Sequence, residues 1–145
     1  MAQDDTPTTA SWTEIARSPF VSLGTYRHSG GLVETPVWVA LEGGEMVVTT
    51  DRTTGKVKRL RHDPRVVLRP CSRMGAVAED APTVHGTARI LPAEDPAAIA
   101  GEQALRRTYG LQYRLLIGGE RLLRRLRRKP DTRVILRLAP ATPSD

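Results

Sequence analysis

Hydroxyl side chains, a glycine and a lysine gather where a predicted strand gives way to a predicted helix. Thr49 and Thr50 end an apolar run, and Thr53-Thr54-Gly55-Lys56 follows shortly after it. The first N–H groups of a helix have no partner in the chain, so hydroxyls and an ammonium beside them create a binding site for an anion. We therefore predict that a phosphate group binds at this corner.

The elements that must position this corner are a hairpin and a short helix. Two apolar, β-branched runs, Val37–Leu41 and Met46–Thr50, flank the turn Glu42-Gly43-Gly44-Glu45, which is typical of a β-hairpin. The segment Thr53–His62 is predicted to be a short helix. It ends before Asp63-Pro64, because the residue before a proline disfavours the helical conformation.

Short strands are predicted on both sides of the hairpin. In chain order the predicted strands are Phe20–Tyr26, Leu32–Leu41, Met46–Thr50, Arg65–Pro70, Met74–Ala78, Thr83–Leu91 and Thr132–Leu138. Pro36 falls inside the second of them. Since proline has no N–H to give to a sheet, Pro36 must face an edge, a bulge or a ligand.

Three helices are predicted in addition to the one at the corner. A capping box at Ser11–Glu14 indicates a short helix to Arg17, with Trp12, Ile15 and Ala16 as its packing face. Near the C-terminus, Pro92–Thr108 and Leu111–Lys129 carry helical patterns.

The order of these elements predicts the fold class. Strands and helices do not alternate along the chain. This favours an antiparallel barrel of six or seven strands, mainly β with two C-terminal helices before the last strand, over a doubly wound parallel sheet. A chain of 145 residues suits one domain. We expect a flexible leader over 1–10, the domain over 11–138 and a flexible tail over 139–145.

Composition excludes several classes of site. The single cysteine, Cys71, allows neither an internal disulfide nor a multi-cysteine metal site, and we expect it to be a small buried apolar residue. His28, His62 and His85 lack metal-ligand spacing, so no metal is expected, and we assign them to turns or the surface. The polar N-terminus and the absence of a long apolar run predict a cytoplasmic protein without a membrane span.

The net charge of +6 comes mostly from arginine. It indicates either an anionic partner or a solvated surface. The basic run Arg121–Lys129 has three interpretations: the solvated face of an amphipathic helix, which we favour, a contact to an acidic cofactor tail, or a patch for nucleic acid or a membrane surface. No aromatic residues alternate with the basic ones, which argues against nucleic acid.

Two stretches of the sequence carry a resemblance to a known family. They read V-S-L-G-T-Y-R-H-S-G-G-L-V-E-T-P-V-W-V-A-L-E-G-G-E-M-V-V-T-T and T-G-K-V-K-R-L-R-H-D-P-R-V. Over Ser18–Leu91 the chain resembles the pyridoxamine 5′-phosphate oxidase-like split β-barrel superfamily, and within it the deazaflavin (coenzyme F420)-dependent branch. The resemblance implies an FMN-binding type of split barrel, a homodimer, and a cofactor held in a groove between the subunits.

The resemblance also implies roles for individual residues. The cofactor ring would lie against Pro36, Val37 and Trp38, although Trp38 fits a core position equally well. Thr49 and Thr50 would contact the phosphate or the chain next to the ring, and Lys56 would pair with the phosphate. Lys58 and Arg59 would hold an acidic tail. FMN-binding oxidases of this type usually carry an arginine just before the phosphate lysine, where this chain has Gly55, and this difference favours F420 over FMN.

The function that follows is transfer of hydride from reduced F420 to an unsaturated small molecule. No residue is identified as the proton donor, so the catalytic residues stay unassigned. The alternatives are a non-catalytic protein that binds F420, flavin or haem, an FMN-dependent oxidoreductase, and a nucleic-acid-binding barrel.

Overall fold

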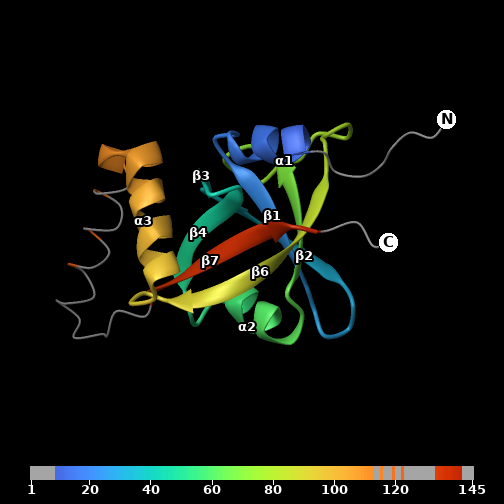
Figure 1. Ribbon diagram of the computed structural model, residues 1–145. Coiled ribbons are helices and arrows are strands. Elements are labelled where there is room, and N and C mark those ends of the chain that lie inside the picture. The colour runs from blue at the N-terminus through green and yellow to red at the C-terminus, as the bar shows by residue number, and fades with distance from the viewer. Residues whose placement is uncertain (1–8, 113–114, 116–118, 120–121, 123–132, 142–145) are drawn as a thin grey trace.

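The computed structural model describes residues 9–112, 115, 119, 122 and 133–141. Within them, seven strands form one antiparallel sheet in the order β2-β1-β5-β6-β7-β4-β3, with helices around it (Figure 1). The elements are α1 (Thr9–Ala16), β1 (Val21–Tyr26), β2 (Leu32–Val37), β3 (Ala40–Glu42), β4 (Glu45–Asp51), α2 (Gly55–His62), β5 (Arg65–Pro70), β6 (Val84–Pro92), α3 (Pro96–Tyr109) and β7 (Arg133–Pro140).

The two edges of this sheet meet, because β2 and β3 are its opposite ends and yet follow one another in the chain. Only Trp38 and Val39 separate them, and three Cα–Cα steps reach at most about 11 Å. The sheet must therefore curl into a barrel that closes at these two residues, a place that we call the seam. This confirms the predicted split β-barrel, and it corrects the prediction of a single strand over Leu32–Leu41.

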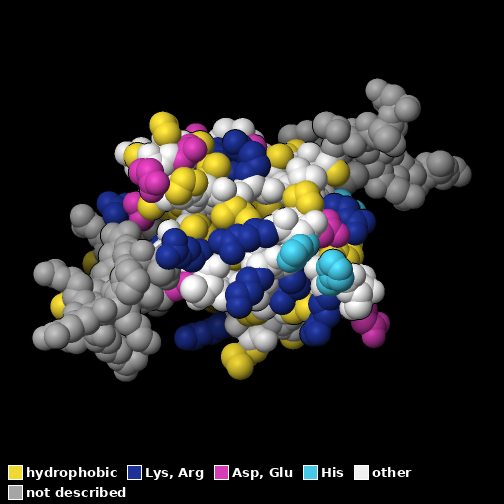
Figure 2. Space-filling model, turned by 90° about the horizontal axis from the view of Figure 1, so that it is seen from below, with side chains coloured by type: hydrophobic (Ala, Val, Ile, Leu, Met, Phe, Trp, Pro, Cys, Tyr) yellow, Lys and Arg dark blue, Asp and Glu magenta, His cyan; other side chains and the backbone are white. Residues whose placement is uncertain are grey.

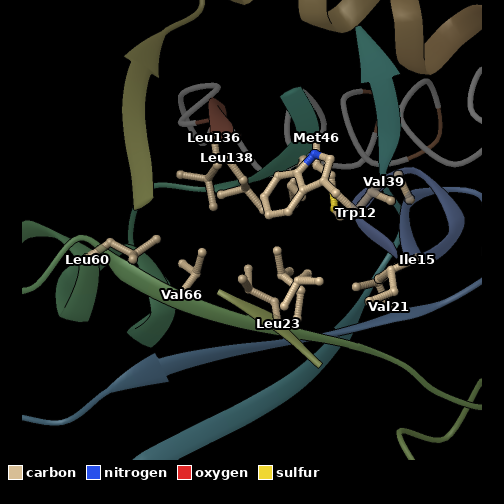
Figure 3. Packing of buried hydrophobic residues seen from close by; sticks show 14 of the residues in the cluster. Trp12, Ile15, Val21, Leu23, Val39, Met46, Leu60, Val66, Leu136 and Leu138 are labelled. Carbon is tan, nitrogen blue, oxygen red and sulfur yellow. The ribbon is translucent and has the colours of Figure 1, made fainter. Parts of the chain in front are cut away.

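The inside of the barrel is filled by apolar side chains from nearly every element. Trp12 and Ile15 of α1 enter it from one end and are almost fully buried. Figure 3 shows them pointing toward Leu23, Val66 and Leu136. The indole N–H of Trp12 donates to the carbonyl oxygen of Gly44 at 3.0 Å, so burying it leaves no polar group unpaired.

This arrangement confirms the packing face predicted for the first helix, although the predicted capping box is wrong. Trp12, Ile15 and Ala16 are all buried. Ser11, however, lies inside α1, where it cannot be the N-cap.

A second, smaller core lies outside the barrel, where α3 covers β4 and β7 (Figure 1). Gly101 allows the close approach, since a Cβ there would lie 2.7 Å from Cγ1 of Val47. Pro92, the predicted start of the next helix, is instead the last residue of β6, and helix α3 begins at Pro96. The side chain of Asp95 caps it by accepting from the N–H of Ala97 at 2.8 Å.

Other boundaries differ from the predicted ones. The strand predicted over Met74–Ala78 is wrong, because this segment is a loop in which Gly75 has a φ of +92°, a value that strands do not use. The helix predicted over Leu111–Lys129, and the basic run within it, fall largely outside the described residues. Strand β7 continues to Pro140, into the segment predicted as a tail.

The described part of the chain contains neither a candidate membrane span nor a cluster of metal-binding side chains. None of its helices has the length and apolar character needed to cross a membrane. Nor do these residues bring three or more His, Cys, Asp or Glu side chains together as a metal site.

Candidate functional site: the β4–α2 corner and the seam

The turn between β4 and α2, which we call the corner, is held by the hydrogen bonds of Asp51. Its Oδ1 accepts from the backbone N–H of Thr53 at 2.8 Å and from the hydroxyl of Thr53 at 2.7 Å. The hydroxyl of Thr54 donates to the carbonyl oxygen of Asp51 at 2.9 Å. Thr54 occupies the N-cap position but makes no side-chain cap bond, and the first turn of α2 holds no acidic residue. The start of α2 is therefore open to an external anion.

Three cationic side chains surround this helix start. Lys56 is half-buried in the first turn of α2, and Arg59 follows one turn later. Arg133 reaches the corner from β7, which pairs with β4 so that Arg133 lies opposite Asp51. Helix α2 and strand β7 are distant in sequence, and the pairing of β7 with β4 brings them together.

Hydrogen bonds fix both guanidinium groups. Nε of Arg59 donates at 2.7 Å to the hydroxyl of Thr25, which is fully buried on β1. The same guanidinium folds back over the helix start. A Cβ added to Gly55 would lie only 2.8 Å from its Nη1. Nε of Arg133 donates to the hydroxyl of Thr49 at 3.1 Å.

The electrostatics of the corner favour a bound anion. Burial lowers the pKa of Lys56, and the charges of Arg59 and Arg133 lower it further. Among the described residues no carboxylate forms an ion pair with Lys56 or Arg59. A phosphate or carboxylate at this point would offset the repulsion and accept hydrogen bonds from the open N–H groups.

The seam presents the second half of the candidate site. The Trp38 ring stacks on the ring of Tyr109 in α3, with centroids 4.9 Å apart and planes 15° apart. The Tyr109 hydroxyl donates to the carbonyl oxygen of Val39 at 2.7 Å and accepts from its N–H at 3.1 Å. Burial raises the pKa of Tyr109, so this hydroxyl stays protonated as a donor. Helix α3 thus holds the seam in place.

The residues predicted from the sequence fall into two groups. Thr50, Gly55, Lys56 and Arg59 lie at the corner, where the hydroxyl oxygens of Thr50 and Thr54 are 3.5 Å apart. Thr49 lies on the other face of the sheet, where it lines a small hollow together with Glu102 of α3 and Arg133. Lys58 is exposed on α2.

The remaining three predicted residues lie at the seam. Pro36 is exposed on the edge strand β2, as its missing N–H requires, while Val37 and Trp38 are half-buried. The second tryptophan, Trp12, is the one that fills the core.

Sequence reasoning missed Arg133, Thr25 and Tyr109. Arg133 stands at the start of a strand with alternating apolar residues, where an arginine is ordinary. Only the pairing of β7 with β4 reveals its place. Cys71 is half-buried rather than buried, and burial raises the pKa of its thiol.

Comparison with known proteins identifies the family. The family model described as pyridoxamine 5′-phosphate oxidase matches residues 8–142. The chain belongs to this family. A search of curated proteins gives no significant match.

Solved structures of other proteins share this fold. A conserved hypothetical protein, Rv2991 from Mycobacterium tuberculosis, is 19% identical over 98% of this chain and 86% of its own, with a TM-score of 0.64. HutZ, the haem storage protein from Vibrio cholerae, is 12% identical over 90% of this chain and 88% of its own, with a TM-score of 0.66. A protein described as an F420 reductase is 19% identical over 89% of this chain and 92% of its own, with a TM-score of 0.55.

Proposed function

We propose that this protein is an F420-dependent oxidoreductase that transfers hydride from reduced deazaflavin to an unsaturated small molecule. The observation that carries the proposal is the half-buried Lys56, placed with Arg59 and Arg133 at the uncapped start of α2. The lowered pKa of Lys56 shows that its positive charge is disfavoured there, and a bound anion would stabilise that charge. The likeness to an F420 reductase supports the fold that this function needs.

The described residues fit the parts of such a cofactor. Lys56, the hydroxyl of Thr50 and the N–H groups of α2 would hold the phosphate. Pro36, Val37 and Trp38 would lie along the ring, and Lys58 and Arg59 would meet an acidic tail. The deazaflavin supplies the hydride, and the chain supplies binding and orientation.

The charge at the corner does not by itself separate F420 from FMN. Gly55 replaces the arginine usual before the phosphate lysine, but the space it leaves is occupied by the guanidinium of Arg59. The positive charge is thus restored from the next turn. The F420 assignment therefore rests on the resemblance of the sequence to the deazaflavin-dependent branch, and on Lys58 as a further cation for an acidic tail.

In this proposal the cofactor lies between two copies of the chain, so the protein is a homodimer. Light scattering of the purified protein should give a mass of two chains. A mass of one chain would contradict the groove between subunits.

The cofactor is tested by incubating the purified protein separately with F420, FMN and haem, and by measuring which one is retained. We expect retention of F420, and oxidation of reduced F420 when an enone or quinone is added. Tight binding of F420 without oxidation by any such acceptor would instead support a storage protein. Retention of haem or FMN alone would refute the proposal.

The corner is tested by Lys56→Ala. Loss of a charge-assisted contact to phosphate should weaken F420 binding roughly tenfold to a hundredfold in a fluorescence-quenching titration. Arg61→Ala is the matched control, because Arg61 is an exposed cation on the same helix. Equal affinity in both variants would count against phosphate binding at the corner.

A further inference from the structure

A hollow of about 400 Å³ lies beside the corner, between the β1–β2 turn and the C-terminal half of α2. Arg27, Lys58 and Arg59 line it together with the two histidines His28 and His62. Figure 2 shows the face of the molecule that carries α2, where Lys and Arg side chains gather and two histidines lie side by side among them. The hollow is thus surrounded mostly by side chains that carry or can accept a positive charge.

The acidic side chain of the hollow, Asp63, is already engaged. Its Oδ2 lies 2.6 Å from Nη2 of Arg65, and this pairing lowers the pKa of Asp63 to about 2. The guanidinium of Arg65 also lies 4.6 Å over the ring of Tyr26, which lines the hollow too. Asp63 therefore remains charged at neutral pH, but Arg65 balances its charge.

The two imidazole rings meet edge to face at the hollow, with centroids 5.7 Å apart and planes at 79°. His62 stands in the last turn of α2, where the helix dipole favours a cation. Arg27, Lys58 and Arg59 line the same hollow as the two rings. An anion in contact with both rings would stabilise their protonated forms.

We propose that this hollow is a second anion site, for a carboxylate or phosphate group, and that His28 and His62 take up protons when the group binds. The inference extends the proposed function and rests on it in part, because Lys58 and Arg59, which we assign there to the acidic tail, line the same hollow. Because Arg59 contributes to both places, the anionic group is either a free small molecule or an extension of the molecule bound at the corner. In both cases the group that enters the hollow is a carboxylate or a phosphate.

Binding of a free small molecule is tested with triglutamate, whose carboxylates stay charged between pH 6 and 8. Calorimetric titration at pH 6 in two buffers of different ionisation enthalpy measures the protons taken up. We expect binding with proton uptake, and an affinity that falls from pH 6 to pH 8. The double variant His28→Gln/His62→Gln should bind about tenfold more weakly at pH 6, without proton uptake.

Binding of an extension of the cofactor is tested with two ligands: F420 that carries its oligoglutamate tail, and the tail-free form. Wild type and the double variant are titrated with each. A loss confined to the tailed form would place the tail in the hollow. His85→Gln is the matched control, since His85 is exposed on β6 and does not line the hollow. Lys56→Ala separates the sites, because it should weaken binding at the corner and leave triglutamate binding intact.

The inference is overturned if the double variant behaves as wild type in both titrations. It is also overturned if Lys56→Ala, and not the double variant, abolishes triglutamate binding. In that case the anion binds at the corner only.

Discussion

Lys56 is the residue at which binding and stability oppose one another. Its pKa is lowered in the folded protein, chiefly by burial and then by Arg59 and Arg133, so its positive charge destabilises the empty protein. A lysine whose pKa is lowered by folding carries this cost at every pH below its folded pKa, because it is then charged in both the folded and the unfolded protein. The cost disappears as the pH rises above the ordinary lysine value of 10.5.

Lys56→Met should therefore stabilise the protein in the absence of ligand, because it removes the charge and keeps most of the side-chain volume. The gain should be below about 1 kcal/mol, since Lys56 is partly exposed. Urea unfolding at pH 7 measures it, and the difference from wild type should shrink toward pH 10.5. Arg61→Met, on the exposed side of α2, should change little. A variant less stable than wild type at pH 7 would show that Lys56 has a stabilising partner.

The sequence predicted Lys56 and its neighbours at the corner because a local pattern encodes them. A strand that ends in hydroxyls, followed by glycine and lysine, places these groups together without help from the rest of the fold. Arg133 and Thr25 reach the corner through strand pairing, and Arg133 comes from the far end of the chain. No local pattern encodes which strands become neighbours, so these contacts were not predictable.

At the scale of elements, the sequence located most strands and failed where the fold bends them. The run Leu32–Leu41 is continuously strand-like, yet the structure divides it into β2 and β3 at opposite edges of the sheet. Alternation of residue types reports which residues favour a strand, and it does not report where a barrel closes. Pro36 indicated an edge, and β2 is indeed one.

Gly86 on β6 shows how tightly the elements approach one another. A Cβ at this position would lie 2.4 Å from the carbonyl oxygen of Ala139 on β7, and 3.0 Å from Cη2 of Trp12. The first neighbour is backbone within a paired strand, so it cannot move aside without breaking the β6–β7 ladder. Here a glycine is required by the close approach of other atoms.

Gly86→Ala should accordingly destabilise the protein by about 2 kcal/mol or more, as expected for overpacking against a rigid neighbour. Chemical unfolding monitored by tryptophan fluorescence measures the loss. Gly31→Ala is the matched control, because the space around Gly31 is open apart from a side-chain atom of Arg27 at 3.7 Å. Equal stability of the two variants would mean that β6 and β7 can separate at this point.

For the whole molecule, the sequence predicted a split barrel, and the structure confirms it. The prediction succeeded because consecutive short strands leave few alternatives to an antiparallel barrel, and because the family resemblance agrees with them. How the barrel is joined to α3 was not predictable. Besides the apolar core under α3, one polar contact of this attachment comes from Arg137, an arginine in the last strand that is only 5% exposed.

Arg137 connects three parts of the fold through its guanidinium group. Nε donates to Oε1 of Glu45 at 2.6 Å, and Nη2 donates to Oε1 and to the carbonyl oxygen of Glu42 at 2.6 Å and 2.9 Å. Nη1 donates to the carbonyl oxygen of Ala97 in α3 at 3.0 Å. One buried cation therefore links β7, the β3–β4 hairpin and the first turn of α3.

Arg137→Met should destabilise the protein by about 3 kcal/mol, because it leaves two carboxylates partly buried without their cation. Burial opposes ionisation of Glu45, but Arg137 and Arg89 outweigh it and lower the pKa of Glu45 below 4.5. The stability that this carboxylate contributes is thus fully present above pH 4.5 and is lost as the pH falls through its lowered pKa. Wild type and Arg137→Met should therefore converge in urea unfolding as the pH is lowered from 7 to 3.

Arg89→Met is the matched control, because it removes an exposed partner that lies 3.2 Å from the same Oε1 of Glu45. It should cost less than about 1 kcal/mol. Equal losses in the two variants would show that burial of Arg137 adds nothing to the ion pair.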